Sequence, residues 1–170
     1  MCANSPKLVR KSSFASVTDL RCRVLILGSL PGEKSLEERQ YYAHPRNRFW
    51  HLVGKAIGAD LASLDYPARL EVLLSHRIGL WDVVASAQRK GSLDSAIREA
   101  QHNPLADLAT SLPDLRAVAF NGGRSAKIGT KQLGESGLAL LPLPSSSPAH
   151  AAMPLAEKER RWARIADYLV

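Results

Sequence analysis

The most constraining feature of the chain is a short apolar run, Val24–Leu27 (VLIL), that ends at once in Gly-Ser-Leu-Pro-Gly. Such a run, bounded by Arg23 and Gly28, predicts a parallel strand buried on both faces. The stretch continues through a polar loop with two tyrosines to His-Pro-Arg-Asn-Arg-Phe-Trp, which opens a predicted helix. A buried strand delivers the residues that follow it to one edge of a sheet, where α/β proteins build their sites. We therefore expect residues 23–50 to carry the functional site.

Further apolar runs alternate with amphipathic segments along the rest of the chain. Strands are predicted at residues 24–27, 80–84, 115–120 and 138–143. Helices are predicted at residues 48–57, 67–75, 105–112, 125–133 and 155–170, with Asn103 as the cap of the third. This alternation predicts the α/β class, with a parallel sheet covered by helices on both faces. The loops at residues 28–47, 121–124 and 144–154 should then meet at one edge.

Length and composition predict one globular domain. The chain has 170 residues, of which 45% are hydrophobic and 23% charged. We expect residues 1–20, which are mostly polar, to be a loosely ordered N-terminal segment, and residues 21–170 to form the domain. No apolar run approaches the roughly 20 residues that cross a membrane, and no secretory signal is visible, so a cytoplasmic location is expected. Cys2 and Cys22 are expected to be free thiols.

The net charge of +7 favours a polyanionic partner, because neutralising phosphates releases counterions. Several other functions are disfavoured because the chain lacks the residue spacing that their motifs require. Gly28–Ser35 (GSLPGEKS) lacks the glycine spacing and the Gly-Lys pair of a phosphate-binding P-loop. The five histidines show no metal-ligand spacing, and Ser145–Ser147 has no nucleophile elbow. No metal is expected.

Aromatic and basic residues remain as the candidates for a site. Tyr41 and Tyr42 suit stacking on an unstacked base, and padding of the loop is an equal alternative. Phe49 and Trp50 are expected in the core, at the start of an amphipathic helix. Basic residues near the predicted edge suit phosphate contacts, with a solvated charged face as the alternative reading; they are Arg46, Arg48, Arg124 and Lys127.

Five segments in this order resemble the uracil-DNA glycosylase superfamily: GSLPG, YYAHPRNRFW, GLWDVV, FNGGRSA and LPSSSPAH. They are most similar to its hypoxanthine-DNA (deoxyinosine) glycosylase branch. The segment AHPRNRFW also resembles the AHPxNRFW stretch of the mismatch-specific uracil-DNA glycosylases. The resemblance runs from about residue 23 to residue 151. It implies a three-layer α/β/α sandwich with a short four-stranded parallel sheet, and no cofactor.

The activity that the resemblance implies is hydrolysis of the N-glycosidic bond of a flipped, deaminated base, leaving an abasic site. The partner is double-stranded DNA, and a monomer is expected to act on it. The mismatch-specific branch has an Asn inside its first turn, as GINPG, whereas this chain has Ser29-Leu30 there. In the hypoxanthine branch the essential Asn corresponds to Asn47. This departure favours hypoxanthine over uracil as the substrate base.

The site residues that follow from the motifs fall into three groups. The catalytic group is Asn47 and Ser29. The base pocket is expected to contain Gly28, Leu30, Pro31, Tyr42, Trp81, Asp82 and Asn121. The residues expected to contact DNA are His44, Arg46, Gly122, Arg124, Ser145, Ser146, Ser147, Pro148 and His150, where His150 stands at a position that is often Asn in the branch.

The residues suit this chemistry, because a neutral amide such as Asn47 can orient a water beneath the sugar carbon of an oxocarbenium-like transition state. Polar groups around the base can stabilise its developing negative charge, so a pair of carboxylates is not required. Two alternatives stay open from the sequence. One is excision of uracil or thymine from mismatches with guanine on the same fold. The other is a non-catalytic protein that binds damaged or single-stranded DNA.

Overall fold

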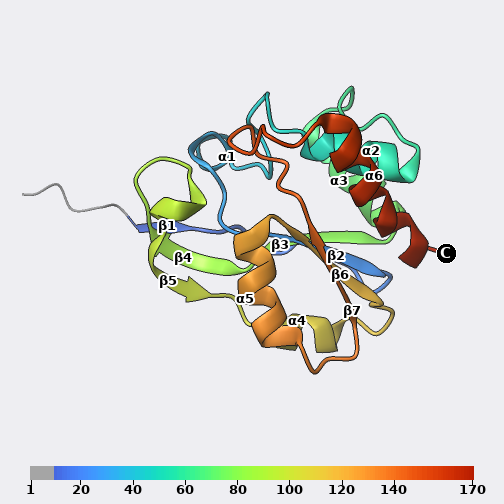
Figure 1. Cartoon of the computed structure of the whole chain (residues 1–170). Coiled ribbons are helices and arrows are strands. Elements are labelled where there is room, and N and C mark those ends of the chain that lie inside the picture. The colour runs from blue at the N-terminus through green and yellow to red at the C-terminus, as the bar shows by residue number, and fades with distance from the viewer. Residues whose placement is uncertain (1–9) are drawn as a thin grey trace, which may run out of the picture.

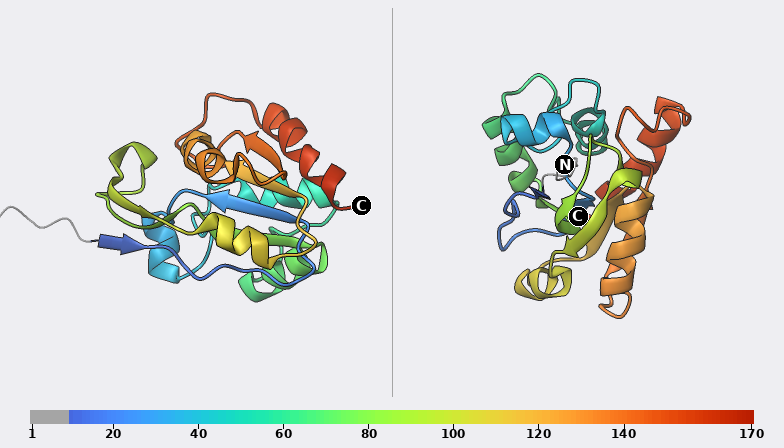
Figure 2. Two further views of the ribbon diagram at one scale, coloured as in Figure 1. Left: turned by 90° about the horizontal axis from the view of Figure 1, so that it is seen from below. Right: turned by 90° about the vertical axis from the view of Figure 1, so that its left-hand side faces the viewer.

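The computed structural model describes residues 10–170 and contains a central sheet of four parallel strands (Figure 1). Its strands lie in the order β3-β2-β6-β7 and are β2 (Val24–Gly28), β3 (Ile78–Asp82), β6 (Ala117–Asn121) and β7 (Ala139–Leu143). Helices cover both faces of the sheet, as further views show (Figure 2). The predicted α/β class and three-layer sandwich are confirmed.

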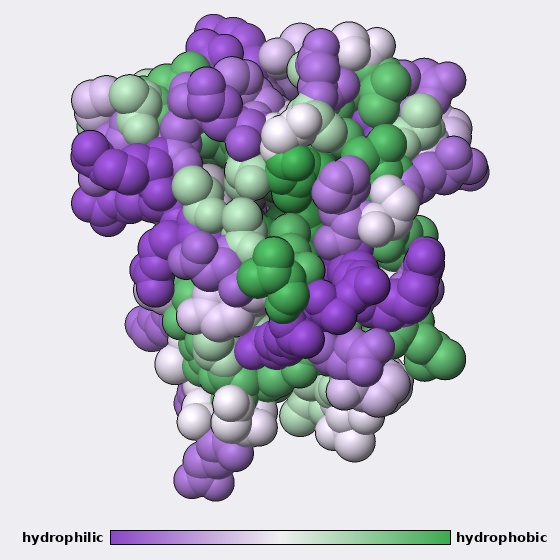
Figure 3. Space-filling model, turned by 90° about the vertical axis from the view of Figure 1, so that its right-hand side faces the viewer, coloured by the Kyte–Doolittle hydropathy of each residue, from purple (hydrophilic) through white to green (hydrophobic). Residues whose placement is uncertain are grey.

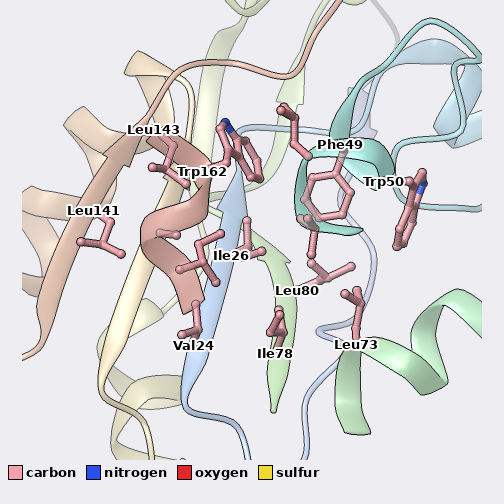
Figure 4. Close-up of a cluster of buried hydrophobic side chains, with 14 of the residues drawn as sticks. Val24, Ile26, Phe49, Trp50, Leu73, Ile78, Leu80, Leu141, Leu143 and Trp162 are labelled. Atoms are coloured by element: carbon pink, nitrogen blue, oxygen red, sulfur yellow. The ribbon is translucent and has the colours of Figure 1, made fainter. Parts of the chain in front are cut away.

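Side chains of β2 alternate between two hydrophobic clusters, one on each face of the sheet. Val24 and Ile26 pack among aromatic rings, with Trp50 and Trp162 in the same cluster (Figure 4). The helices over this face are α2 (Phe49–Ile57), α3 (Tyr66–Ser75) and α6 (Leu155–Trp162). Leu25 and Leu27 face the aliphatic cluster under α4 (Leu105–Ser111) and α5 (Gly123–Leu133). Every residue of β2 is buried, as the apolar run predicts.

A second sheet, which the sequence did not predict, lies beside the first (Figure 1). It is antiparallel, in the order β1-β4-β5, with β1 (Arg10–Ser12), β4 (Val84–Gln88) and β5 (Arg98–His102). The single strand predicted at residues 80–84 is therefore two strands that join at Val83. The sequence of β5, REAQH, has no apolar alternation because the strand is largely exposed.

The N-terminal region differs from the loose segment expected over residues 1–20. Arg10–Ser12 pairs with β4, and Val17 forms an isolated bridge to Leu80. Backbone hydrogen bonds therefore hold this part of the chain. Residues 1–9 lie outside the described residues.

The remaining elements refine the predicted boundaries. The chain adds a helix α1 (Glu33–Glu38) and a 3₁₀ turn η1 (Asp94–Ala96), and the predicted helix over residues 155–170 changes after Trp162 into a 3₁₀ segment η2 (Ala163–Tyr168). The prediction that Asn103 caps α4 was wrong. Its side-chain amide instead donates to the carbonyl of Asp82 at 2.7 Å. Among residues 10–170, no helix is both long and apolar enough to cross a membrane.

The face on which the C-terminal end lies is mixed in character (Figure 3). Hydrophilic residues cover much of it, with smaller hydrophobic areas between them. On α6 the apolar Trp162 is fully buried, whereas most of the side chains of Arg160 and Arg161 are exposed. The amphipathic pattern predicted for this helix is therefore present, with the apolar side against the sheet.

Candidate active site

A cavity of about 400 Å³ opens at the carboxyl edge of the parallel sheet. The three loops predicted to converge there all contribute to it, because parallel strands end at one edge. The lining also includes residues 92–95, from the hairpin between β4 and β5. Of the residues predicted for the site, those that line the cavity are Gly28, Ser29, Leu30, Pro31, Tyr42, His44, Asn47, Asp82, Asn121, Gly122, Ser145, Ser146, Ser147, Pro148 and His150.

Three predicted residues do not line the cavity: Trp81, Arg46 and Arg124. Trp81 precedes Asp82 on β3, and successive side chains on a strand point to opposite faces. Its indole N–H donates instead to the carbonyl of Phe14 at 3.0 Å. Arg46 is exposed outside the cavity, and Arg124 is partly buried at the start of α5.

The part of the site formed by the strand ends and the tyrosine against them, here called the cavity floor, consists of Gly28, Tyr42, Asp82 and Asn121. Gly28 and Asp82 end the neighbouring strands β2 and β3 and face each other in register, while Asn121 ends β6 on the other side of β2. The ring of Tyr42 stacks on Phe49, with 3.8 Å between centroids. A Cβ on Gly28 would lie 2.8 Å from both Asp82 Oδ1 and the Tyr42 hydroxyl oxygen. Only glycine leaves room for both oxygens.

Asp82 is a buried carboxyl on this floor, with 3% of its surface exposed. Its Oδ2 accepts a hydrogen bond from the Ser13 hydroxyl at 2.7 Å. Burial raises the pKa of Asp82 to about 7, against the lowering effect of the Ser13 hydrogen bond, and the charge of Asp94 raises it further. Arg89 has a smaller lowering effect. The carboxyl therefore exchanges its proton near neutral pH.

Asn47 lies at the side of the cavity, just before α2. Its Oδ1 accepts a hydrogen bond from the backbone N–H of Phe49 at 2.9 Å, and its own N–H donates to the carbonyl of His44 at 2.9 Å. The bond to Oδ1 orients the side-chain amide, and the bond from the backbone N–H closes the turn from His44 to Asn47. Within residues 10–170 no side chain or backbone group hydrogen-bonds to Nδ2 of Asn47, so this group can hold a water or a substrate atom.

The Gly-Ser-Leu-Pro-Gly turn is held by residues that belong to no recognisable sequence motif. The buried Arg89 guanidinium donates to the carbonyls of Leu30 and Pro31, and to Gly91 O at 2.9 Å. The Ser29 hydroxyl donates to Asp94 Oδ2 at 2.9 Å. Both partners come from the hairpin between β4 and β5, which has no motif and is recognised only from the fold.

The serine loop, residues 145–150, is attached to the floor through Asn121. The Asn121 Nδ2 donates to the Ser146 hydroxyl at 2.8 Å, and the Ser146 N–H donates to Asn121 Oδ1 at 2.9 Å. From α6, Lys158 Nζ donates to the carbonyls of Ser145 at 2.8 Å and His150 at 2.7 Å. Burial lowers the pKa of Lys158, and the charge of Arg48 adds to this effect. Lys158, which no sequence motif indicates, thus positions the loop.

Comparisons with known proteins place this fold and site in the class of DNA glycosylases, hydrolases that act on N-glycosyl bonds. The family model of the uracil DNA glycosylase superfamily matches residues 15–167, and the chain belongs to this superfamily. Two relatives named hypoxanthine DNA glycosylase come from Methanosarcina barkeri and Methanosarcina acetivorans. The first is 44% identical over 119 residues, covering 70% of this chain and 75% of the relative; the second is 39% identical over 155 residues, covering 91% and 97%.

A solved structure supports the same assignment. It is a solution NMR structure of a protein from Methanosarcina acetivorans that is named a "putative Uracil DNA glycosylase". It superposes with a TM-score of 0.85 at 38% identity, covering 95% of this chain and 99% of the other. The family resemblance noted from the sequence motifs is therefore confirmed, and so is the expected enzyme class.

Proposed function

We propose that this DNA glycosylase excises hypoxanthine, the deamination product of adenine, from double-stranded DNA and leaves an abasic site. The observation that carries the proposal is the arrangement of the cavity. An amide, Asn47, flanks it at the side, and a buried carboxyl, Asp82, closes it below. Two relatives at 39% and 44% identity are named for hypoxanthine, which supports this base over uracil.

In the proposed reaction Asn47 positions the attacking water. Its Oδ1 retains one lone pair beyond the bond from Phe49 N–H, and its Nδ2 is free of partners within the described chain. An oriented amide suits this role, because departure of the base runs ahead of attack by water and a strong base is not needed. The buried floor supplies a low-dielectric environment in which hydrogen bonds to the departing base are strong.

DNA is expected to enter across the loops around the cavity. The net charge of +7 favours contact with phosphates. The serine loop, with Ser147, Pro148 and His150 on the cavity lining, is placed to press on the duplex beside an extruded nucleotide. We propose that a single chain carries out the reaction, in the cytoplasm and on the nucleoid.

The direct test is excision from labelled duplexes that contain a single hypoxanthine, uracil or mismatched thymine, followed by alkali to cleave abasic sites. Strand cleavage of the hypoxanthine duplex in excess over the other two is expected. Cleavage confined to the uracil or thymine duplexes would contradict the proposal and show that the substrate is a mismatched uracil or thymine. Binding to all three duplexes without any cleavage would instead show a non-catalytic DNA-binding protein.

A further inference from the structure

Two buried oxygen atoms on the cavity floor are not used by the role assigned to Asn47. They are Asp82 Oδ1 and the Tyr42 hydroxyl, which approach the same point above Gly28. We propose that Asp82 is the general acid of the reaction and donates its proton to a ring nitrogen of the departing purine. This inference rests on the proposed excision of hypoxanthine. It assigns the group that protonates the purine and so makes it a good leaving group.

The Tyr42 hydroxyl indicates that this part of the cavity is built for a ligand. It is buried and has no hydrogen-bond partner among residues 10–170. A buried hydroxyl without a partner costs about 1–3 kcal/mol, so an occupant that hydrogen-bonds to it recovers that loss. The backbone of Tyr42 also lies in the left-handed region, with φ of 54°, which is uncommon for a non-glycine residue.

The groups that face Asp82 leave it able to hold a proton. The hairpin between β4 and β5 contributes the Asp94 carboxylate and the Arg89 guanidinium. The loop between α1 and α2 contributes the hydroxyls of Tyr41 and Tyr42, and the N-terminal segment contributes the Ser13 hydroxyl. Arg89 is the single cation among them, and its N–H groups are directed to the carbonyls of residues 30, 31 and 91. Asp82 forms no ion pair within the described chain, and burial raises its pKa to about 7.

The chemistry of the base explains why an acid is needed. When the bond between C1′ and N9 breaks, its electron pair goes to the purine, which is a poor leaving group as an anion. Transfer of the Asp82 proton to N3 or N7 breaks the carboxyl O–H bond, forms a ring N–H bond and releases neutral hypoxanthine. Water adds to C1′ and loses a proton, which returns through solvent to the Asp82 carboxylate. Uracil leaves as an anion delocalised over two carbonyl oxygens and depends less on such an acid.

Asp82→Asn tests the proposal directly, because the amide has nearly the same shape and can still accept from Ser13. Single-turnover excision of hypoxanthine should be about 10²–10³-fold slower than in the parent chain. The parent rate should fall as pH rises above about 7, where Asp82 loses its proton, and the variant rate should not change with pH. Asp107→Asn, an exposed carboxyl on α4, is the matched control and should keep the parent rate and pH profile.

Ser13→Ala gives a second readout that does not depend on the folding of Asp82→Asn. The Ser13 hydrogen bond lowers the pKa of Asp82, so its removal should shift the alkaline limb of the pH profile to higher pH. A structural role alone would not move this limb. An unchanged profile in Ser13→Ala, or an Asp82→Asn variant as fast as the parent, would overturn the general acid. Absence of hypoxanthine excision by the parent chain would instead overturn the proposed function.

Discussion

The cavity floor and the loops around it are built in opposite ways. On the floor, Gly28, Asp82 and Asn121 are the last residues of adjacent strands, and their positions are set by the register of the sheet. The surrounding loops have no regular pairing and are held at a few points by side chains that donate to backbone carbonyls. Arg89 holds the Gly-Ser-Leu-Pro-Gly turn, and Lys158 holds the serine loop.

We propose that this difference separates the chemical step, on the floor, from contact with DNA, in the loops. A floor fixed by a sheet keeps a carboxyl buried and its pKa raised, which catalysis of a proton transfer requires. Loops attached at a few points can adjust to a duplex and reclose after release of the product. We therefore expect changes on the floor to alter the chemical step and its pH dependence. Changes in the loops or their attachments should mainly alter affinity for DNA.

Asn47 tests the boundary between the two regions, since it lies on a loop but is proposed to act in the chemical step. Asn47→Ala should reduce the single-turnover excision rate by roughly 10³-fold, an effect of about 4 kcal/mol, because the water loses its positioning group. Affinity for the hypoxanthine duplex, measured by fluorescence anisotropy, should stay within a few-fold of the parent.

Asn47→Asp is the matched control for folding. Its carboxylate can still accept from the Phe49 N–H at the start of α2, but it cannot donate to water. This variant should keep the thermal stability of the parent and lose excision. Full excision by Asn47→Ala would show that Asn47 has only a structural role at the helix start, whereas excision by Asn47→Asp alone would show that Oδ1 and not Nδ2 holds the water.

Asp82 should also affect the stability of the protein, because its pKa is higher in the folded chain than in the unfolded chain. The folded chain binds the Asp82 proton more tightly than the unfolded chain, whose carboxyl has a pKa near 3.8. The resulting stabilisation is complete below pH 3.8 and is lost as the pH rises towards 7. Asp82→Asn should therefore be more stable than the parent at pH 8, by roughly 2–4 kcal/mol.

The measurement is urea unfolding of both proteins at pH 5 and pH 8. The parent should lose more unfolding free energy than Asp82→Asn between these two conditions, since every other titrating group is shared. Equal losses of unfolding free energy would mean that the pKa of Asp82 is not raised on folding. They would contradict the proposed electrostatic difference between the floor and the loops.

The floor was largely predictable from the sequence, and the attachments of the loops were not. An apolar run such as VLIL indicates a buried strand, and strand ends in a parallel sheet meet at one edge, so Gly28, Asp82 and Asn121 could be grouped. The prediction for Trp81 was wrong because side chains alternate along β3, and Asp82 is the one that faces the cavity. The polar strands β1 and β5 give no hydrophobic pattern, so the hairpin that carries Arg89 and Asp94 was missed.

Lys158 tests the loop side of the comparison. Lys158→Met removes the two hydrogen bonds from Nζ to the carbonyls of Ser145 and His150, while the aliphatic part of the side chain remains. We expect the KM for the hypoxanthine duplex to rise about tenfold, with kcat within about threefold of the parent, because the floor is unchanged. Lys131→Met, on the exposed far part of α5, controls for the loss of one charge. A fall in kcat as large as the rise in KM would show that the serine loop takes part in the chemical step.

The smallest expected effect belongs to Arg46, which is exposed beside Asn47 but does not line the cavity. If its guanidinium contacts a phosphate, Arg46→Ala should weaken binding of all duplexes by about the same factor, whatever base they contain. The slope of log affinity against log salt should become less steep by about one, because one counterion fewer is released. Lys131→Ala carries the same loss of charge and should leave the slope unchanged. An unaltered slope in Arg46→Ala would show that the DNA backbone does not contact this residue. A loss of affinity confined to hypoxanthine duplexes would show that Arg46 contributes to recognition of the base.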